Sequence, residues 1–132
     1  MRYLLDTDIC IEVIRRREFI SSRVRDQAPG DLVIASMTVA ELRYGALNSS
    51  APDRALAAVD AFLSAPLTIL PFDEPAARQH AQARLALRSQ PIGERDLVIA
   101  ATALAGGHTV VTGNHQHFER VPGLQVEDWT VE

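Results

Sequence analysis

Short apolar runs alternate with longer helical patterns along most of the chain. The apolar runs are YLLD, LVIA, LTIL and TVVT, and helical periodicity follows the first three over residues 8–17, 36–47 and 73–90. This alternation is typical of α/β proteins, in which each crossover helix returns the chain to begin a parallel strand. We therefore expect an α/β fold with a short, mainly parallel central sheet flanked by helices.

Residues with capping and turning preferences support these boundaries. Ser36 and Asp73 stand where helix N-caps are expected, and Pro52 opens a further helix with an apolar face. Gly106-Gly107 ends the last long helix, and Pro122-Gly123 turns the chain into a final short segment, LQVEDW. Because no repeat, linker or low-complexity tract interrupts the sequence, we expect one domain over residues 1–132.

The composition suits a packed core without covalent cross-links. Apolar residues make up 47% of the 132 residues, and the lone Cys10 has no partner for an internal disulfide. The first residues do not form a signal peptide, and the longest apolar run, residues 97–105, is well short of the roughly 18 residues that span a bilayer. We expect a cytoplasmic protein that does not enter a membrane.

The charge balance gives two opposing indications about nucleic acid. A net charge of −4 argues against a general nucleic-acid binder, because such proteins usually carry a basic excess. All thirteen basic residues are arginine, whose planar guanidinium suits bidentate phosphate contacts. High-GC codon usage explains the missing lysines equally well, so composition alone leaves the question open.

Acidic residues stand at the ends of the predicted strands and in the first turns of the helices, where open parallel sheets collect their chemistry. Asp6 directly follows the first strand and precedes a helix that Thr7 or Asp8 can cap. A plain N-cap role for Asp6 is the alternative to a functional one.

Two further carboxylates belong to apolar helices. Glu41 lies one turn into the helix after LVIAS, where a solvated glutamate, or one in a salt bridge with Arg43 or Arg78, is the alternative to a functional role. Asp96 lies in the first turn of a helix that is apolar almost all round, and an unpaired buried carboxylate costs several kcal/mol. The helix N-terminus, Arg95 or a metal ion must compensate that charge.

The neighbouring polar residues favour oxygen ligands. Thr112 and Asn114 follow the TVVT strand, and Glu94 is either a supporting partner of Asp96 or a first-turn charge. Together with the carboxylates they favour Mg²⁺ or Mn²⁺. Zinc is disfavoured, because His115 and His117 have no third soft ligand nearby in sequence.

Three motifs then carry a family resemblance. The segments LLDTDICIEVI, TVAELRYGA and PIGERDLVIAATALAGGHTVVTGNHQHFERVPGLQVEDW together resemble the PIN domain, and specifically the VapC toxins of bacterial VapBC toxin-antitoxin systems. The intervening APDRALAAVDAFLSAPLTILPFDEPAA is similar to the same family, so the resemblance covers essentially the whole chain.

The resemblance implies an activity and a set of site residues. Asp6, Glu41 and Asp96 take the positions of the family's metal-binding and catalytic acids. The implied activity is Mg²⁺-dependent endoribonuclease cleavage of tRNA or other structured RNA, with Mn²⁺ able to substitute. A metal-activated water would attack in line and leave a 5′-phosphate and a 3′-hydroxyl. The implied partners are a VapB-type antitoxin and a second copy of the chain.

Departures from the family pattern mark residues with open roles. Asp8 replaces the asparagine of the usual DTN motif, which leaves it as either ligand or helix cap. Asn114 and His117 stand where many relatives place an acid, so the fourth ligand and the number of metals are open. For Arg15, Arg16 and Arg17 we hypothesise a contact with RNA phosphate or antitoxin; charge complementarity at a helix end is the alternative.

Two rival functions belong to other classes. The LLDTD motif also resembles the aspartate nucleophile of haloacid-dehalogenase phosphatases and response-regulator receivers, but both families use a lysine that this chain lacks. The other rival is a PIN-fold module that binds RNA or antitoxin with weak or no turnover.

Overall fold

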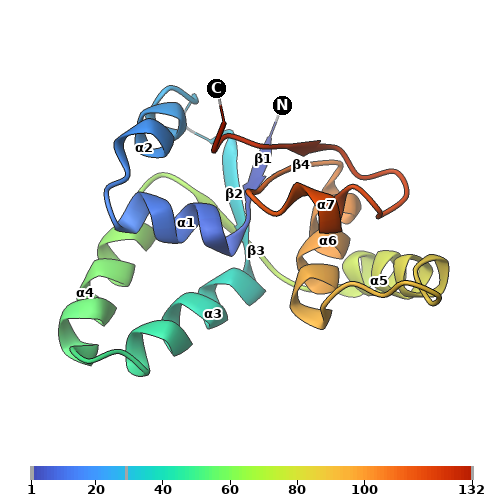
Figure 1. Cartoon of the computed structure of the whole chain (residues 1–132), viewed down its shortest axis with the longest axis horizontal. Coiled ribbons are helices and arrows are strands. Elements are labelled where there is room, and N and C mark those ends of the chain that lie inside the picture. Colours follow the sequence, from blue (N-terminus) through green and yellow to red (C-terminus); the bar gives the residue numbers. More distant parts are fainter. Residues whose placement is uncertain (1, 29, 132) are drawn as a thin grey trace.

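The computed structural model describes residues 2–28 and 30–131, and within them the strands form one five-stranded sheet (Figure 1). The strands are β1 (Tyr3–Leu5), β2 (Leu32–Ala35), β3 (Thr68–Leu70), β4 (Thr109–Val111) and β5 (Val126–Glu127). Their order is β3-β2-β1-β4-β5, and every neighbouring pair is parallel. The predicted α/β class and parallel sheet are confirmed.

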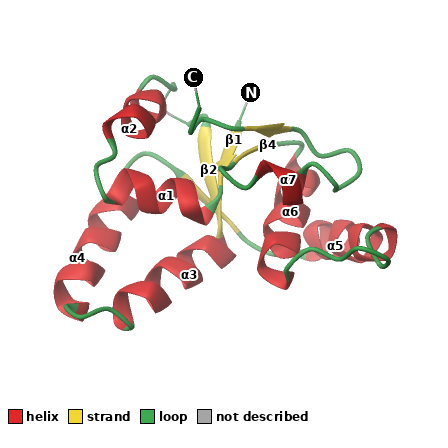
Figure 2. Cartoon of the chain, viewed as in Figure 1, coloured by secondary structure: helices red, strands yellow, loops and turns green. Residues whose placement is uncertain are grey.

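Helices cover both faces of this sheet (Figure 2). They are α1 (Thr7–Ile14), α2 (Glu18–Arg25), α3 (Ser36–Leu47), α4 (Pro52–Leu63), α5 (Glu74–Ala86), α6 (Glu94–Gly106) and α7 (His115–Phe118). Helices α1 to α4 lie on one side, and α5 to α7 lie on the other. None of the helices in the described ranges is long and apolar enough to cross a membrane.

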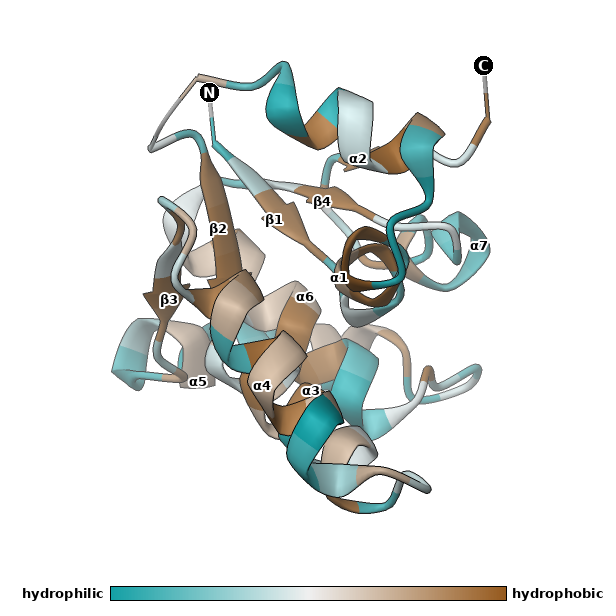
Figure 3. Ribbon diagram, turned by 90° about the vertical axis from the view of Figure 1, so that its left-hand side faces the viewer, coloured by the Kyte–Doolittle hydropathy of each residue, from teal (hydrophilic) through white to brown (hydrophobic). Residues whose placement is uncertain are grey.

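Each side of the sheet has its own hydrophobic core, because successive strand residues point to opposite faces. The central strand residues that face α5 and α6 are Leu4, Val33 and Val110, and those that face α1 to α4 are Leu5, Ile34 and Val111. All six are fully buried. Burial on both faces explains why these strands are continuous apolar runs (Figure 3).

The strand order places a topological switch point beside β1. From β1 the chain proceeds through β2 to β3 at one edge, and it then returns through α5 and α6 to form β4 on the other side of β1. In open α/β sheets, a crevice forms at the carboxyl ends of the strands at such a point. Asp6 follows β1 and Thr112 follows β4, so both lie there.

The helix predicted over residues 8–17 is wrong at its C-terminal end. α1 ends at Ile14, Arg16 adopts a left-handed backbone with φ of 60°, and a separate helix, α2, begins at Glu18. A left-handed residue after a helix is usually glycine or asparagine. Because arginine stands at this position, the sequence gives no sign that the helix ends there. The sequence pattern predicts neither α2, which buries only Ile20 and Ser21, nor the short α7.

The capping predictions have mixed outcomes. Ser36 is not a cap: it is the first residue of α3, and no side-chain hydrogen bond caps that helix. The prediction that Asp73 is an N-cap is confirmed, because its Oδ1 accepts a hydrogen bond from the Ala76 amide at 3.1 Å. The predicted stop after α6 is also confirmed, with Gly107 in the left-handed region at φ of 67°. The helix predicted over 73–90 ends earlier, at Ala86.

Candidate active site

Asp6 lies at the carboxyl end of β1 and is held from two sides. Its Oδ1 accepts a hydrogen bond from the Thr7 amide at 2.8 Å, and its Oδ2 accepts one from Thr112 Oγ1 at 2.8 Å. Thr112 in turn accepts a hydrogen bond from the Asn114 amide at 2.9 Å. Asp6, and not Thr7 or Asp8, is therefore the N-cap of α1, and the same carboxylate is fixed against the end of β4.

The electrostatic environment of Asp6 opposes its ionisation. Burial is the main cause: together with the charges of Asp8 and Asp96 it raises the pKa of the Asp6 carboxyl to about 7, against the hydrogen bonds from Thr112 and Thr7. Asp6 is only 6% exposed. Negative charges from α1 and α6 thus act on one buried carboxyl, and a cation placed among them would relieve the repulsion.

Glu41 projects from α3 toward the start of α1. Its Oε1 accepts a hydrogen bond from Thr7 Oγ1 at 2.6 Å, and Thr7 Oγ1 also lies 3.1 Å from the buried Thr38 Oγ1. Arg95 Nη1, from α6, lies 3.3 Å from Glu41 Oε2. The prediction that Arg43 or Arg78 pairs with Glu41 is wrong. Arg43 pairs with Asp60, and Arg78 pairs with Glu74.

Asp96 lies in the first turn of α6, where the positive end of the helix dipole favours a carboxylate. Its neighbour is His117 and not Arg95: His117 Nδ1 lies 3.2 Å from Asp96 Oδ2. The same Nδ1 lies 2.9 Å from Asn114 Nδ2. One ring nitrogen cannot accept from the amide and donate to the carboxylate at the same time, so the tautomer of His117 selects between these contacts.

The other residues predicted for the site, which are Asp8, Glu94 and the three arginines, make contacts of their own. Asp8 Oδ2 accepts a hydrogen bond from the Gly113 amide at 3.2 Å, which ties α1 to the loop after β4. Glu94 Oε1 lies 2.8 Å from His80 Nε2 on α5. The arginines at positions 15–17 connect α1 to α2, and Arg17 Nε lies 3.6 Å from Glu12 Oε2.

Sequence reasoning overlooked part of the hydrogen-bond network. Thr38 lies fully buried behind Thr7, and Arg95 contacts the glutamate on α3 and not the aspartate beside it on α6. The position of Thr38, three residues before Glu41 in the same helix, is the one local signal that points to it.

The donor set fits a hard divalent cation that retains water. Among the residues that the structure describes, no three Asp, Glu, His or Cys side chains converge as a ready-made metal cage. Mg²⁺ does not need one, because it is commonly held by one or two carboxylates with waters and phosphate oxygens. The groups around Asp6 are carboxylates and hydroxyls, and negative charge is in excess there. These features fit Mg²⁺ or Mn²⁺ better than zinc.

Comparisons with known proteins identify the family of the chain. A family model described as PIN domain matches residues 3–124. The chain is 41% identical to the tRNA(fMet)-specific endonuclease VapC of Salmonella typhimurium, and 42% identical to Ribonuclease VapC2 of Haemophilus influenzae strain Rd. Each comparison covers 98% of both chains.

The fold is similar to that of solved relatives. In the crystal structure of DNA-bound VapBC from Salmonella typhimurium, the matching chain has a TM-score of 0.91 and 40% identity over 98% of both chains. In VapBC2 from Rickettsia felis bound to a promoter DNA fragment, the TM-score is 0.87 with 31% identity, over 98% of this chain and 99% of that chain. PIN-domain ribonucleases in general depend on divalent metal ions. The domain match and the full-length relatives together show that this chain belongs to the PIN-domain family and, within it, to the VapC ribonucleases.

Proposed function

We propose that this protein is the toxin of a type II toxin-antitoxin system and cleaves RNA with Mg²⁺ held by Asp6, Asp96 and Glu41. The carrying observation is the buried Asp6 carboxylate, which the Thr7 amide and Thr112 hold at the end of β1, with Glu41 linked to the same place through Thr7 Oγ1 and with Asp8 and Asp96 close enough to oppose its charge. Such a site gains most from a divalent cation, and Mn²⁺ is expected to substitute for Mg²⁺. Residues 1–132 would form a single domain that acts in the cytoplasm.

The chain's own residues supply positioning and charge for this reaction. When bound, the metal ion provides a water of lowered pKa and neutralises charge on the phosphate. Thr112 and the Thr7 amide fix the orientation of Asp6, and Thr7 Oγ1 fixes one oxygen of Glu41. Glu41 then orients the attacking water. In-line attack leaves a 5′-phosphate and a 3′-hydroxyl.

Accessory roles follow from the contacts of the neighbouring residues. We assign Thr112 and Asn114 to the support of Asp6, and His117 to the place next to Asp96 where a further ligand would stand. Asp8 contributes negative charge and anchors the loop at Gly113. Glu94 is assigned only a first-turn charge that His80 partners.

For the substrate we propose tRNA, with the initiator tRNA as the first candidate. The support is the full-length relative named tRNA(fMet)-specific endonuclease, at 41% identity. Recognition of structured RNA depends largely on shape and on unpaired loops, so related chains need not share one cleavage site.

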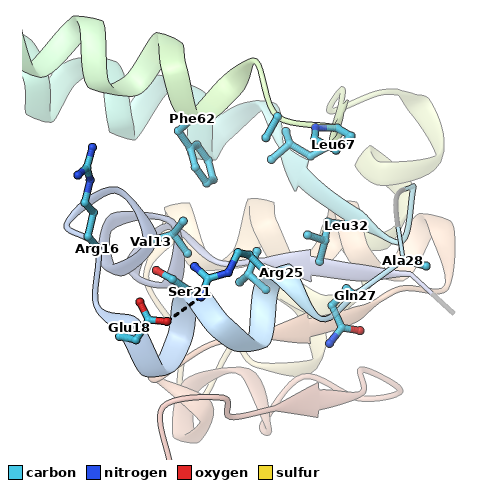
Figure 4. Close-up of a pocket in the computed structure, with 13 residues that line it drawn as sticks. Val13, Arg16, Glu18, Ser21, Arg25, Gln27, Ala28, Leu32, Phe62 and Leu67 are labelled. Carbon is cyan, nitrogen blue, oxygen red and sulfur yellow. Dashed lines mark hydrogen bonds and ion pairs between the residues drawn. The ribbon is translucent and has the colours of Figure 1, made fainter.

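As a partner we propose a VapB-type antitoxin that docks in an apolar groove and reaches the acidic site. The groove, of about 680 Å³, lies between α1, α2 and the end of α4, and Val13, Leu32 and Phe62 line it (Figure 4). Ser21 Oγ is buried beside it without a hydrogen-bond partner among the described residues. Such a groove suits the apolar face of a helix, and several similar chains were solved in VapBC complexes. We also propose that the toxin forms a homodimer.

A nuclease assay on the purified chain tests the proposed activity. Initiator and elongator tRNA transcripts are incubated with Mg²⁺, with Mn²⁺ or with EDTA, and Asp96→Asn is purified in parallel to exclude a contaminating nuclease. We expect metal-dependent cleavage that Asp96→Asn abolishes, with 5′-phosphate ends on the products. RNA or antitoxin binding without metal-dependent cleavage would instead favour the binding-module alternative.

A further inference from the structure

A shallow hollow of about 280 Å³ lies on α3 and α6, directly beside Glu41. Met37, Ala40, Glu41 and Tyr44 line it from α3, and Arg95 lines it from α6. Ala40 and Glu41 each lie three or four positions from both Met37 and Tyr44, so the four residues share one side of the helix. The hollow is slightly smaller than the roughly 300–1,000 Å³ of pockets that enclose whole small molecules, so its size suits one planar group.

Tyr44 forms one wall of the hollow and is open to solvent. Its relative exposure is 67%, and among the described residues its side chain makes no hydrogen bond and no ring contact. An exposed aromatic residue is not unusual by itself. Its position is informative, because it lies three residues after Glu41, which is a proposed metal ligand, and lines the same hollow.

Arg95 lines the hollow from α6 and has unused hydrogen-bonding capacity. Its side chain is 71% exposed, and its one ion-pair contact among the described residues joins Nη1 to Glu41 Oε2 at 3.3 Å. A guanidinium has five N–H donors, so the others are available to a phosphate or to a base edge. The hollow thus combines an aromatic ring and a guanidinium with apolar side chains. Proteins bind unpaired nucleotides with such groups.

We propose that this hollow is a subsite for an unpaired nucleobase next to the scissile phosphate, with the base stacked on Tyr44 and the adjoining phosphate bound by Arg95. The inference rests on the proposed ribonuclease function and adds a contact that positions the substrate. Stacking accepts any base, so the subsite would select RNA with an unpaired nucleotide at the cleavage site, as in a loop.

Binding to a cleavage-inactive protein tests the subsite. In the Asp96→Asn background, the affinity for a tRNA transcript and for a short single-stranded RNA is measured with Tyr44→Ala and Tyr44→Phe. Removing the stacking partner of one base corresponds to a decrease of about 5- to 100-fold in affinity. We therefore expect that decrease for Tyr44→Ala and near-complete retention for Tyr44→Phe. Leu47→Ala is the matched control, because Leu47 is 61% exposed on the same helix but does not line the hollow.

A second measurement tests the base contact in the active protein. After the cleavage site is mapped, an abasic nucleotide is placed beside it; this change should raise KM for the wild-type protein but not further for Tyr44→Ala. Normal binding and cleavage by Tyr44→Ala would overturn the subsite and leave the ribonuclease proposal intact. If Tyr44→Ala weakened RNA binding but the protein with Asp96 intact cleaved no RNA, the base-binding hollow would stand and the ribonuclease would be overturned. A Tyr44→Ala protein whose oligomeric state changes while its RNA affinity does not would identify the face as an interface between copies and overturn the subsite.

Discussion

At the scale of single residues, the Asp6 carboxyl lies in an environment that strongly opposes its charged form. It is almost completely buried, and Asp8 and Asp96 add negative potential, so its pKa is raised from 3.8 to about 7. The folded, metal-free chain therefore holds a proton that the unfolded chain releases at a much lower pH. This difference makes stability depend on pH.

Asp6→Asn should remove that pH dependence. Between pH 4 and 7 the unfolded chain ionises Asp6 while the folded chain keeps it protonated, so rising pH destabilises the metal-free wild-type fold. A pKa shift of this size lowers the free energy of unfolding of the metal-free protein by on the order of 4 kcal/mol above pH 7, and this loss is absent below pH 4. In EDTA, the excess melting temperature of Asp6→Asn over wild type should therefore grow from pH 4 to 7 and then level off.

The control for that experiment is Asp53→Asn, which removes one negative charge from an exposed position on α4. A difference between Asp6→Asn and wild type that is constant from pH 4 to 8 would contradict the electrostatic account of Asp6. Mg²⁺ should raise the melting temperature of wild type more than that of Asp6→Asn. Only in wild type can residue 6 lose its proton and bind the cation as a carboxylate.

We propose that the residue at position 117 decides whether the site holds a second metal ion. Its Nδ1 lies 3.2 Å from Asp96 Oδ2, but a neutral imidazole adds no charge to offset another hard cation. In calorimetry we expect wild type to bind one Mn²⁺ tightly. His117→Asp should bind a second Mn²⁺ more tightly than wild type does. His117→Ala should reduce cleavage by roughly 10²-fold or less, the range of one positioning or acid-base group. Two equally tight ions in the wild type would refute this assignment.

The residues of the site differ in how well the sequence predicts them. Asp6 and Asp96 are recognisable because each follows or opens an apolar element in which a free carboxylate is costly. The contacts of Thr7, Thr38 and Arg95 are not predictable, because they join residues that are 31 to 54 positions apart. No local pattern encodes which arginine meets which acid.

At the scale of elements, Thr7 links the start of α1 to α3. Its hydroxyl donates to Glu41 Oε1 at 2.6 Å and lies 3.1 Å from Thr38 Oγ1. Thr7→Val keeps the shape but removes these hydrogen bonds, so the unfolding free energy should fall by about 1–2 kcal/mol. Metal affinity or cleavage should fall by about 10- to 100-fold, as is typical when a group that orients a ligand is removed.

Thr7→Ser is the matched variant, because it keeps the hydroxyl. Urea denaturation and single-turnover cleavage of both variants separate stability from chemistry. If Thr7→Val cleaved as fast as Thr7→Ser, Glu41 would not depend on this link, and its proposed orientation would be wrong.

The junction between α1 and α2 carries three arginines in a row. Arg15 caps α1, Arg16 has a left-handed backbone, and Arg17 precedes α2, so they form a connection and not the last turn of a helix. Replacing all three with alanine should weaken RNA binding by an Asp96→Asn protein. The slope of log affinity against log salt should become shallower by about one for each phosphate that the variant no longer neutralises. An unchanged slope, with normal folding, would exclude RNA phosphate as the partner of these arginines and leave antitoxin binding to be tested.

Elements that bury a continuous apolar surface are the ones that the sequence predicts. Most residues of β1, β2 and β4 and of the middle of α6 are buried, and each of these segments appears as a mainly apolar run. α2 is mostly polar and α7 has four residues, so neither carries a periodic apolar pattern. The end of α1 is hidden for a different reason, because the left-handed position holds an arginine in place of glycine.

At the scale of the whole molecule, the parallel sheet brings the distant acids to one edge. The sequence predicts the α/β class, but the order β3-β2-β1-β4-β5 depends on how the crossovers pack, which no local pattern specifies. That order sets the ends of β1 and β4 side by side at the switch point, so Asp6 and Thr112 meet although they are 106 positions apart. α3 and α6 then bring Glu41 and Asp96 to the same edge.

The central claim is that this edge binds the catalytic metal, and anomalous diffraction from a Mn²⁺-soaked crystal tests it most directly. We predict a strong anomalous peak about 2.1 Å from carboxylate oxygens of both Asp6 and Asp96, with Glu41 within reach of a metal-bound water. The peak should be absent from Asp96→Asn crystals soaked in the same way. No peak at Asp6 and Asp96 under conditions in which the same protein cleaves RNA, or a peak only at other residues, would contradict the claim.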